Sequence, residues 1–266
     1  SQHLRPPEPR EIDCLLDEAG DILVRCSAAP ELPGAAEMAR KMRLRGIRLA
    51  LAHSDATCEQ VLEAFGWGFT HITHLYSSTP SVHKVDQRVH AGVVEAAYLL
   101  DDMTVELIGD GRHVPKELLQ VTLKIKGRDR VMLISDAMRA AGTEATESYL
   151  GAICPENRVI IEDGVAKLPD RSFYAGSVAM PDHIFRVMVR EYGLSIADAC
   201  HAMCQVPARH LGLEASKGSI AAGKDADLVI LSPSLELEYV LSRGRVARSP
   251  RPTQEEAQTS CPYMLA

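Results

Sequence analysis

The 266-residue sequence predicts an α/β fold built on a parallel sheet. Three observations lead to this prediction. Amphipathic segments alternate with short apolar runs through the first half, the apolar runs are continuous, and glycines follow the helical segments. Continuous apolar strands are buried on both faces, as happens where helices cover a parallel sheet or surround a barrel. Right-handed crossovers would then make the strands parallel.

The elements of the first half are expected in strict alternation. Helices are predicted at residues 8–20, 34–46, 57 onward, 91–100 and 115–127, and strands at 21–29, 47–54, 70–76, 103–110 and 130–138. Thr57 and Gln60, three residues apart, form the capping-box pattern at the start of the third helix. Gly20 and Gly127 are expected to end the first and fifth helices.

In the second half of the sequence the regular alternation of helices and strands ends. A hairpin is expected at 157–168 around the Asp163-Gly164 turn, because Asp-Gly suits a tight two-residue connection. Two helices should follow near 181–192 and 195–205, and short strands within 217–231 and 237–246 should form a small β appendage. The expected domains are therefore residues 1–213 with the inserted hairpin, the appendage at 214–247, and a loose tail at 248–266.

Composition narrows the classes of partner. Lys and Arg number 29 against 36 Asp and Glu, which gives a net charge of −7 and no basic stripe for nucleic acid. No apolar run approaches the roughly 18 residues of a membrane span, and the opening residues do not resemble a signal peptide. Seven scattered cysteines suit a reducing compartment, so a cytoplasmic protein is expected. Cys200 and Cys204 share a helix face without a second ligand pair, and buried, inert thiols are expected there.

Polar residues stand at the ends of four consecutive predicted strands. They are His53, His74, Asp110 with Gly111 and His113 just after it, and Asp136. Ligands and catalytic groups gather at the carboxyl ends of parallel strands. His71 lies three residues before His74 on a strand, so their side chains should point to opposite faces, and only His74 is expected in the site.

This set of side chains favours metal-assisted hydrolysis. Two neutral imidazoles and a carboxylate suit Zn²⁺ or a similar divalent ion. Such an ion lowers the pKa of bound water to about 7. Asp136 can then take the proton of the water and pass it to a leaving amine. An amide is the simplest substrate.

Six segments carry a resemblance to a known family. They are LAHSDAT, THITHLYSS, ELIGDGRHV, LISDAM, YAGSVAM and KGSIAAGKDADLVIL. In this order and spacing the chain resembles, from about residue 7 to 247, the N-acetylglucosamine-6-phosphate deacetylases of the amidohydrolase superfamily. The resemblance implies a (β/α)8 TIM-type barrel beside a small β-sandwich, and a homodimer that acts on an amino-sugar phosphate.

The resemblance also implies residue roles. His53 and His74 would bind the metal, Asp136 would be the catalytic acid/base, and His113 with Asp110 and Gly111 would hold the substrate near its carbonyl. Two further pairs complete the implied substrate site: Ser77 and Ser78 beside the sugar phosphate, and the Ala175-Gly176 turn over the substrate.

Two departures from the family pattern shape the expectations. Ser77-Ser78 replaces the family's Asn-Ala, and the next loop lacks its Arg-Glu-Pro-Gly, so Lys84 or Arg88 would have to meet the phosphate. The similarity also begins about a third of the way along family members, after the segment that carries a metal-ligand Glu. The chain is therefore expected to hold the last five β/α units and part of the appendage, and to bind its metal weakly.

The sequence thus favours a metal-dependent deacetylase of an N-acetyl amino-sugar 6-phosphate. Two alternatives stay open. One is hydrolysis of a different N-acyl or cyclic amide at the same site, because fold and metal do not fix the substrate. The other is a truncated, non-catalytic relic that lacks the ligand Glu.

Overall fold

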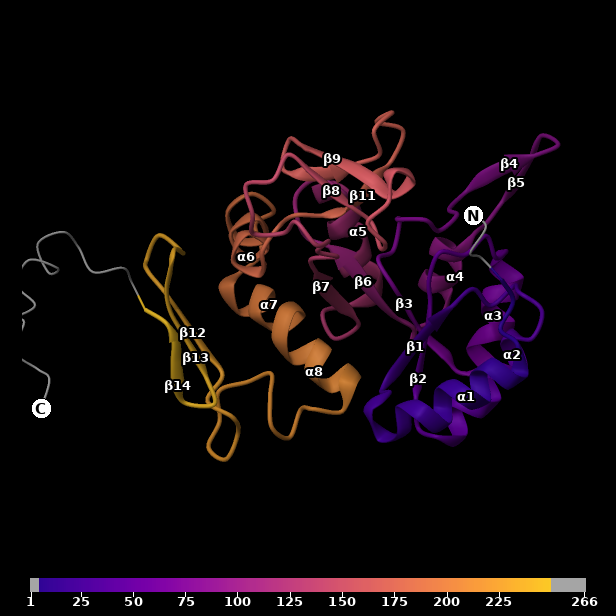
Figure 1. Ribbon diagram of the computed structural model, residues 1–266, viewed down its shortest axis with the longest axis horizontal. Coiled ribbons are helices and arrows are strands. Elements are labelled where there is room, and N and C mark those ends of the chain that lie inside the picture. The colour runs from indigo at the N-terminus through magenta and orange to yellow at the C-terminus, as the bar shows by residue number, and fades with distance from the viewer. Residues whose placement is uncertain (1–4, 250–266) are drawn as a thin grey trace, which may run out of the picture.

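The centre of the molecule is a five-stranded parallel sheet. The computed structural model describes residues 5–249. The sheet contains β1 (Arg25–Ala28), β2 (Arg48–Leu51), β3 (Phe69–Ile72), β6 (Thr104–Ile108) and β7 (Val131–Ile134), in the order β1-β2-β3-β6-β7 (Figure 1). Every neighbouring pair is parallel. The prediction of five parallel strands is therefore confirmed, although each strand is shorter than expected.

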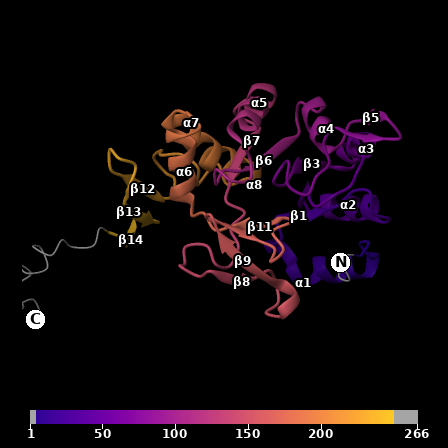
Figure 2. The same cartoon turned by 90° about the horizontal axis from the view of Figure 1, so that it is seen from above.

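Helices connect the strands along one side of the sheet. They are α1 (Pro9–Ala19), α2 (Ala35–Leu44), α3 (Cys58–Trp67), α4 (Val93–Leu99) and α5 (Lys116–Lys126), with a short 3₁₀ turn η1 (Gly20–Ile22) after α1. Each helix packs on the next along the chain. In addition, α2 contacts β2, α3 contacts β3 and α5 contacts β7. Figure 2 shows α2 to α5 in a row outside the curved sheet. This is the ring-like arrangement rather than a sheet covered on both faces.

Local signals in the sequence account for the helix boundaries. Thr57 and Gln60 form the predicted capping box, with Gln60 N–H donating to Thr57 Oγ1 and Thr57 N–H donating to Gln60 Oε1. Gly20 and Gly127 follow the last residues of α1 and α5, as predicted. The buried faces of these helices and the sheet form one hydrophobic core, with Phe69 and Leu107 among its fully buried members.

The second half adds an antiparallel sheet of four strands. These are β8 (Glu147–Tyr149), β9 (Arg158–Glu162), β10 (Val165–Lys167) and β11 (Tyr174–Ser177), in the order β11-β10-β9-β8, with a 3₁₀ turn η2 (Pro155–Asn157) before β9. The hairpin predicted around Asp163-Gly164 is confirmed as β9–β10. The two outer strands are new. Ala175 and Gly176 lie within β11, so the prediction of a turn at this pair is wrong.

The remaining elements follow in chain order. A helical segment comprises α6 (Pro181–Arg190), α7 (Ile196–Cys200), the π-helical turn η3 (His201–Gln205) and α8 (Val206–Leu211), six residues longer than the predicted end at 205. A three-stranded antiparallel sheet contains β12 (Leu228–Leu231), β13 (Leu237–Ser242) and β14 (Arg245–Arg248). A two-stranded hairpin, β4 (His83–Val85) with β5 (Arg88–His90), occupies the expected loop after β3. The tail predicted at 248–266 lies outside the described residues from position 250 onward.

Two further expectations can be compared with the structure. No helix within residues 5–249 is both long and apolar enough to cross a membrane. Cys200 and Cys204 are exposed, so the expectation of buried thiols is wrong for this pair. A π-helical turn begins directly after Cys200 and changes the number of residues per turn. A regular α-helical spacing therefore predicts the wrong side of the helix for this pair.

Candidate active site

Four consecutive strands of the parallel sheet each place a polar residue two positions beyond their last residue. His53 follows β2, His74 follows β3, Asp110 follows β6 and Asp136 follows β7 at this spacing. The ends of β2 and β3 are in register through Leu51 and Ile72, and those of β6 and β7 through Ile108 and Ile134. Equal spacing from aligned ends brings the polar residues to one edge of the sheet, as the sequence predicted.

The backbone leaves the strand conformation at these positions. His53, His74 and Asp136 have φ angles of 48°, 30° and 50°, and Tyr76 and Ser78 after His74 also have positive φ. Side chains other than glycine adopt this left-handed region rarely, although His and Asp do so more often than most. Such strained positions cluster at functional sites, where the surrounding structure has to hold them.

A cavity of about 620 Å³ lies at this edge of the sheet. Its walls include His53, His74, Ser77, Ser78, His113, Asp136, Ala175 and Gly176. Eight of the predicted site residues therefore meet in one space. Its volume is in the range of small-molecule sites.

The two predicted metal ligands lie close together in the cavity. His53 Nε2 lies 3.0 Å from His74 Nε2, and the two rings meet edge to face. His74 Nδ1 lies 3.0 Å from the carbonyl oxygen of Ser77, which can only accept, so Nδ1 carries the proton and Nε2 keeps its lone pair. Desolvation lowers the pKa of His53, with His74 acting in the same direction and Asp136 opposing it, and this favours the neutral imidazole that a metal requires.

The pair fits part of a zinc site. Two nitrogens bound at 2.0–2.1 Å to one tetrahedral ion would be about 3.3 Å apart, close to the observed separation. Within residues 5–249, however, no group of three or more His, Cys, Asp or Glu side chains is placed to hold a metal ion. A catalytic zinc site normally has three protein ligands. Within the described residues, the two imidazoles alone therefore do not complete such a site.

Asp110 and His113 form a buried pair beside this cavity. Asp110 Oδ2 accepts from His113 Nδ1 at 2.7 Å, and Asp110 Oδ1 accepts from the backbone N–H groups of Arg112 and His113. Burial alone would raise the pKa of Asp110, but these bonds outweigh it and hold the pKa at about 2. With Nδ1 committed to Asp110, His113 keeps Nε2 available for a substrate.

Gly111 allows the turn that makes this pair. Its φ is 75°, and a Cβ there would lie 3.1 Å from a methyl group of Val187. Gly111 itself is not on the cavity wall. Of the predicted substrate residues in this segment, only His113 faces the cavity. Asp110 and Gly111 lie outside it and hold His113 in position.

Asp136 shares the cavity with the histidines and is exposed to solvent. Partial desolvation nevertheless raises the pKa of its carboxyl, against the opposing effect of the three histidines His74, His113 and His53. The strand β11 lies alongside, with Ser177 N–H donating to Asp136 O and Met138 N–H donating to Ser177 O. A Cβ at Gly176 would lie 3.2 Å from Asp136 O, so this close approach requires glycine.

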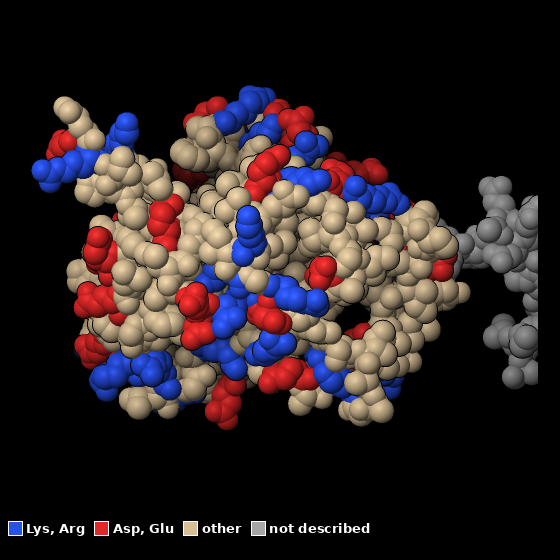
Figure 3. Space-filling model, turned by 180° about the vertical axis from the view of Figure 1, so that it is seen from behind, with Lys and Arg blue, Asp and Glu red and all other residues tan. Residues whose placement is uncertain are grey.

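The predicted phosphate residues are separated in the structure. Ser77 and Ser78 line the cavity, but the Ser77 N–H already donates to His74 O. Lys84 and Arg88 lie on the exposed β4–β5 hairpin and are not on the cavity wall. This hairpin projects from the body of the molecule and carries charges of both signs (Figures 1 and 3).

His71 lies outside the cavity, as predicted. Its Nε2 is 3.0 Å from Glu106 Oε1, and Arg25 Nη1 donates to the same oxygen at 2.5 Å. Burial would raise the pKa of Glu106, but its bonds and charge interactions with His71 and Arg25 hold it at about 2. Sequence reasoning missed this network, because Arg25 and Glu106 are 81 residues apart.

An apolar wall of the cavity was also missed. It consists of Ile108, Met138, Leu150, Phe173 and Tyr174. Tyr174 touches the edge of the His113 ring, with ring centres 4.9 Å apart. The segments ELIGDGRHV, LISDAM and YAGSVAM contain Ile108, Met138 and Tyr174, but no apolar wall was predicted from them.

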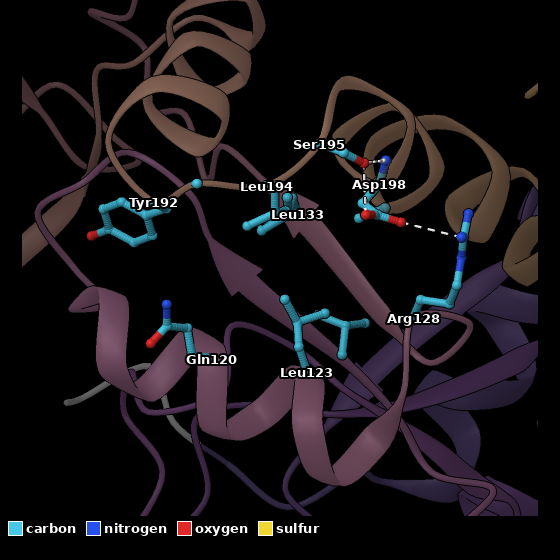
Figure 4. A pocket seen from close by; sticks show the side chains of 11 residues that line it. Gln120, Leu123, Arg128, Leu133, Tyr192, Leu194, Ser195 and Asp198 are labelled. Carbon is cyan, nitrogen blue, oxygen red and sulfur yellow. Dashed lines mark hydrogen bonds and ion pairs between the residues drawn. The ribbon is translucent and has the colours of Figure 1, made fainter.

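A second cavity of about 350 Å³ lies away from the strand-end site, between α5 and the start of α7 (Figure 4). Ser195 and Asp198 cap the helix there, with Ser195 Oγ accepting from Asp198 N–H, and Arg128 pairs with Asp198 at 3.1 Å. The side chains of Ser195, Asp198 and Arg128 are thus linked to one another. Nothing in it matches the predicted chemistry.

Comparisons with known proteins identify the family of the chain. The model of the amidohydrolase family matches residues 24–247. N-acetylglucosamine-6-phosphate deacetylase of Bacillus subtilis is 30% identical over 92% of this chain, and N-acetylgalactosamine-6-phosphate deacetylase of Escherichia coli O157:H7 is 31% identical over 91%. The chain spans 59% and 62% of the lengths of these two relatives.

Solved structures show the same likeness. The crystal structure of N-acetyl-D-glucosamine-6-phosphate deacetylase from Mycobacterium smegmatis has a TM-score of 0.82 at 32% identity, covering 92% of this chain and 63% of that one. A mutant of the same enzyme, solved in complex with N-acetyl-D-glucosamine-6-phosphate, has a TM-score of 0.81 at 31% identity and covers 91% of this chain and 62% of that one.

Proposed function

Because this chain belongs to the amidohydrolase family, we propose that it carries two metal ligands and the acid/base of an enzyme that deacetylates an N-acetyl amino-sugar 6-phosphate. The observation that carries the proposal is the meeting of His53, His74, His113 and Asp136, from four consecutive strands, in one cavity. We further propose that the five parallel strands are part of a (β/α)8 barrel and that β12–β14 belong to its small β appendage.

Each residue has a distinct part in the proposed reaction. His53 and His74 would hold a divalent ion, which we take to be Zn²⁺ and which supplies a water of lowered pKa when bound. Asp136 removes a proton from the attacking water and passes it to the leaving amine, so that amide and water yield acetate and a free amino sugar. His113, fixed by Asp110 through Nδ1, presents the Nε2 lone pair to the substrate and holds it near its reacting carbonyl by accepting from an N–H or O–H of the sugar.

Acetate release tests this proposal directly. The chain would be assayed with added Zn²⁺ or Co²⁺ on N-acetylglucosamine 6-phosphate, on its galacto epimer and on unphosphorylated N-acetylglucosamine. Metal-dependent release from a phosphorylated sugar is expected, and it should vanish in His53→Ala and His74→Ala. Release from neither epimer, by a chain that binds metal tightly, would contradict the proposed substrate class.

Lys84 and Arg88 are proposed to bind the sugar phosphate from the projecting hairpin. Because they are off the wall of their own cavity, a second copy of the chain in a homodimer is the proposed recipient. Lys84→Ala/Arg88→Ala should raise KM for the phosphorylated sugar and leave the unphosphorylated one nearly unchanged. A matched control is Arg40→Ala/Lys124→Ala, which removes two exposed cations elsewhere.

Mixing experiments would show whether the site is shared. Asp136→Asn and Lys84→Ala/Arg88→Ala each impair a different part of the proposed site. If the hairpin serves a second copy, a mixture of the two variants should regain phosphate-dependent activity. Equal loss on both sugars, or no recovery on mixing, would count against the assignment.

A further inference from the structure

The two residues that follow His53 are held by one carboxylate from another strand loop. Glu31 lies just beyond β1 in the sequence. Its Oε2 accepts from Ser54 Oγ at 2.7 Å and its Oε1 accepts from the Asp55 N–H at 2.8 Å. Ser54 Oγ in turn accepts from the Ala56 N–H at 3.0 Å. Both oxygens of Glu31 are thus committed to the backbone turn after His53.

The same turn is tied to the segment that carries the second histidine. Ser54 N–H donates to Ser78 O at 3.2 Å. In the segment of Ser78, the carbonyl of Ser77 accepts from His74 Nδ1 at 3.0 Å. A continuous chain of hydrogen bonds and neighbouring residues therefore runs from Glu31 through Ser54 and Ser78 to His74. We call this chain the Glu31 clamp.

The clamp acts where the backbone is strained. His53 and Ser78 have φ angles of 48° and 51°. A left-handed conformation at such residues persists only where the surroundings hold it. Ser54 is 2% exposed, so its hydroxyl would lose a partner that water cannot easily replace. The histidine pair therefore depends on Glu31 for its geometry.

We propose that Glu31 is a positioning residue for the metal-binding pair, which it holds through Ser54 and Ser78 without contacting the metal. The inference rests on the proposed metal site. It also assigns a role to a carboxylate near the site that the sequence left unassigned. Glu31 is not on the cavity wall, and within residues 5–249 no third His, Cys, Asp or Glu is placed to complete a metal site, so Glu31 supplies hydrogen bonds to the ligand segment and not the third metal ligand.

Metal affinity gives the first test. Loss of a residue that orients a ligand typically weakens metal binding about 10–100-fold. Glu31→Ala should do so in calorimetric titration with Zn²⁺, while the melting temperature of the metal-free protein falls only slightly. Glu31→Gln keeps Oε1 as an acceptor and can donate to Ser54 Oγ, so it should recover most of the affinity. Glu37→Ala, a surface Glu→Ala change on α2, should have no effect.

The variants separate hydrogen bonding from charge. If Glu31→Gln lost as much affinity as Glu31→Ala, the role would be long-range attraction of the cation, and the clamp would be wrong. Equal affinity in Glu31→Ala and the unchanged protein would also overturn it.

A second test needs no metal. In NMR spectra of the metal-free protein, Glu31→Ala should shift the His53 ring signals, weaken the contact between the His53 and His74 rings, and speed hydrogen exchange at the Asp55 amide. Unchanged ring signals and an unchanged inter-ring contact would refute the inference. Failure of the unaltered chain to bind metal would instead count against the proposed function, and these spectra would still decide the role of Glu31.

Discussion

At the scale of single residues, Asp136 has the properties of a group that moves protons. It faces the cavity, it is open to solvent, and desolvation raises its pKa against the pull of three histidines. A carboxyl with a pKa above its ordinary value is a better match for a proton transfer near neutral pH. Its position at the end of β7 could instead be structural, as a cap of the following turn.

Asp136→Asn separates these two roles. Asn tolerates the left-handed backbone, so the fold and the metal site should survive. Loss of a general base should lower kcat for acetate release by about 10²–10⁴-fold. A purely structural cap would cost only about 1 kcal/mol of stability and leave kcat near normal. Steady-state kinetics and a thermal melt on the same sample distinguish them.

Glu106 should make the protein sensitive to acid. Its pKa of about 2 in the folded protein lies below the ordinary value of 4.5. Its contribution to stability is therefore complete above about pH 4.5 and is lost as pH falls from 4.5 towards 2. The lowering of the pKa from 4.5 to about 2 corresponds to about 3 kcal/mol.

Urea unfolding of the unaltered chain and of Glu106→Gln at several pH values would measure this effect. The gap in unfolding free energy between the two should be largest above pH 4.5 and should shrink towards pH 2. A gap that stays constant over this range would show that Glu106 is not the acid-sensitive group.

At the scale of elements, the end of α4 is held by a lysine from α5. Lys126 Nζ donates to the carbonyls of Ala97, Leu100 and Asp101. Leu100 O also accepts from the Met103 N–H, and the ammonium adds a charged donor at this helix end that complements the helix dipole. Burial lowers the pKa of Lys126 to about 8, with Arg130 acting in the same direction.

Lys126→Met should therefore lower the unfolding free energy by about 1–3 kcal/mol, because buried carbonyls lose their donor. Lys124→Met is the matched control, since Lys124 lies exposed on the same helix. It should change stability by less than about 0.5 kcal/mol. Equal effects of the two substitutions in chemical unfolding would argue against the role of Lys126.

Local signals made most elements predictable. Thr57 with Gln60 and the glycines after α1 and α5 placed helix ends correctly because caps depend on neighbouring residues. Strand ends were set too late, since His53 and Asp136 leave the extended conformation that their apolar neighbours suggest. The three-residue strand β8 and the outer strand β11 pair with the neighbouring strands β9 and β10 across longer connections that lack the Asp-Gly signal of the β9–β10 turn.

The residues at the strand ends of the candidate site were also predictable from the sequence. The contacts that hold these residues in place were not. His53, His74 and Asp136 stand at repeated positions along the chain, and parallel topology brings such positions together. The partners of Glu31 and Glu106 lie 23 and 81 residues away, so their bonds depend on tertiary packing. The resemblance assigned phosphate binding to Arg88, although the sequence of its loop differs from that of the family. In the structure Arg88 is not on the cavity wall.

At the scale of the whole molecule, packing is uneven. One large core joins the parallel sheet to its helices, and a small cluster around Val159, Ala166 and Ala175 supports the β8–β11 sheet. Strands β12, β13 and β14 contain no buried residue. Parts of a protein with few buried contacts open more readily than its core.

Hydrogen–deuterium exchange should reveal this order. Amides of β2, β3 and β6 are expected to exchange slowest, those of β9 and β10 at intermediate rates, and those of β12–β14 fastest. Mass spectrometry of peptides from each region would measure the rates. Protection of β12–β14 equal to that of the central strands would show that the small sheet is held more firmly than its burial indicates.

The left-handed backbone at the strand ends also limits how this protein can evolve. Glycine would relieve strain of the order of 1–3 kcal/mol at His53, His74 or Asp136, less the extra entropy that glycine loses on folding. A selection for heat resistance alone should therefore favour glycine at these positions and remove the imidazoles and the carboxylate at the same time. Stability and activity compete at the same residues, so heat-adapted descendants that keep the chemistry must gain their stability elsewhere.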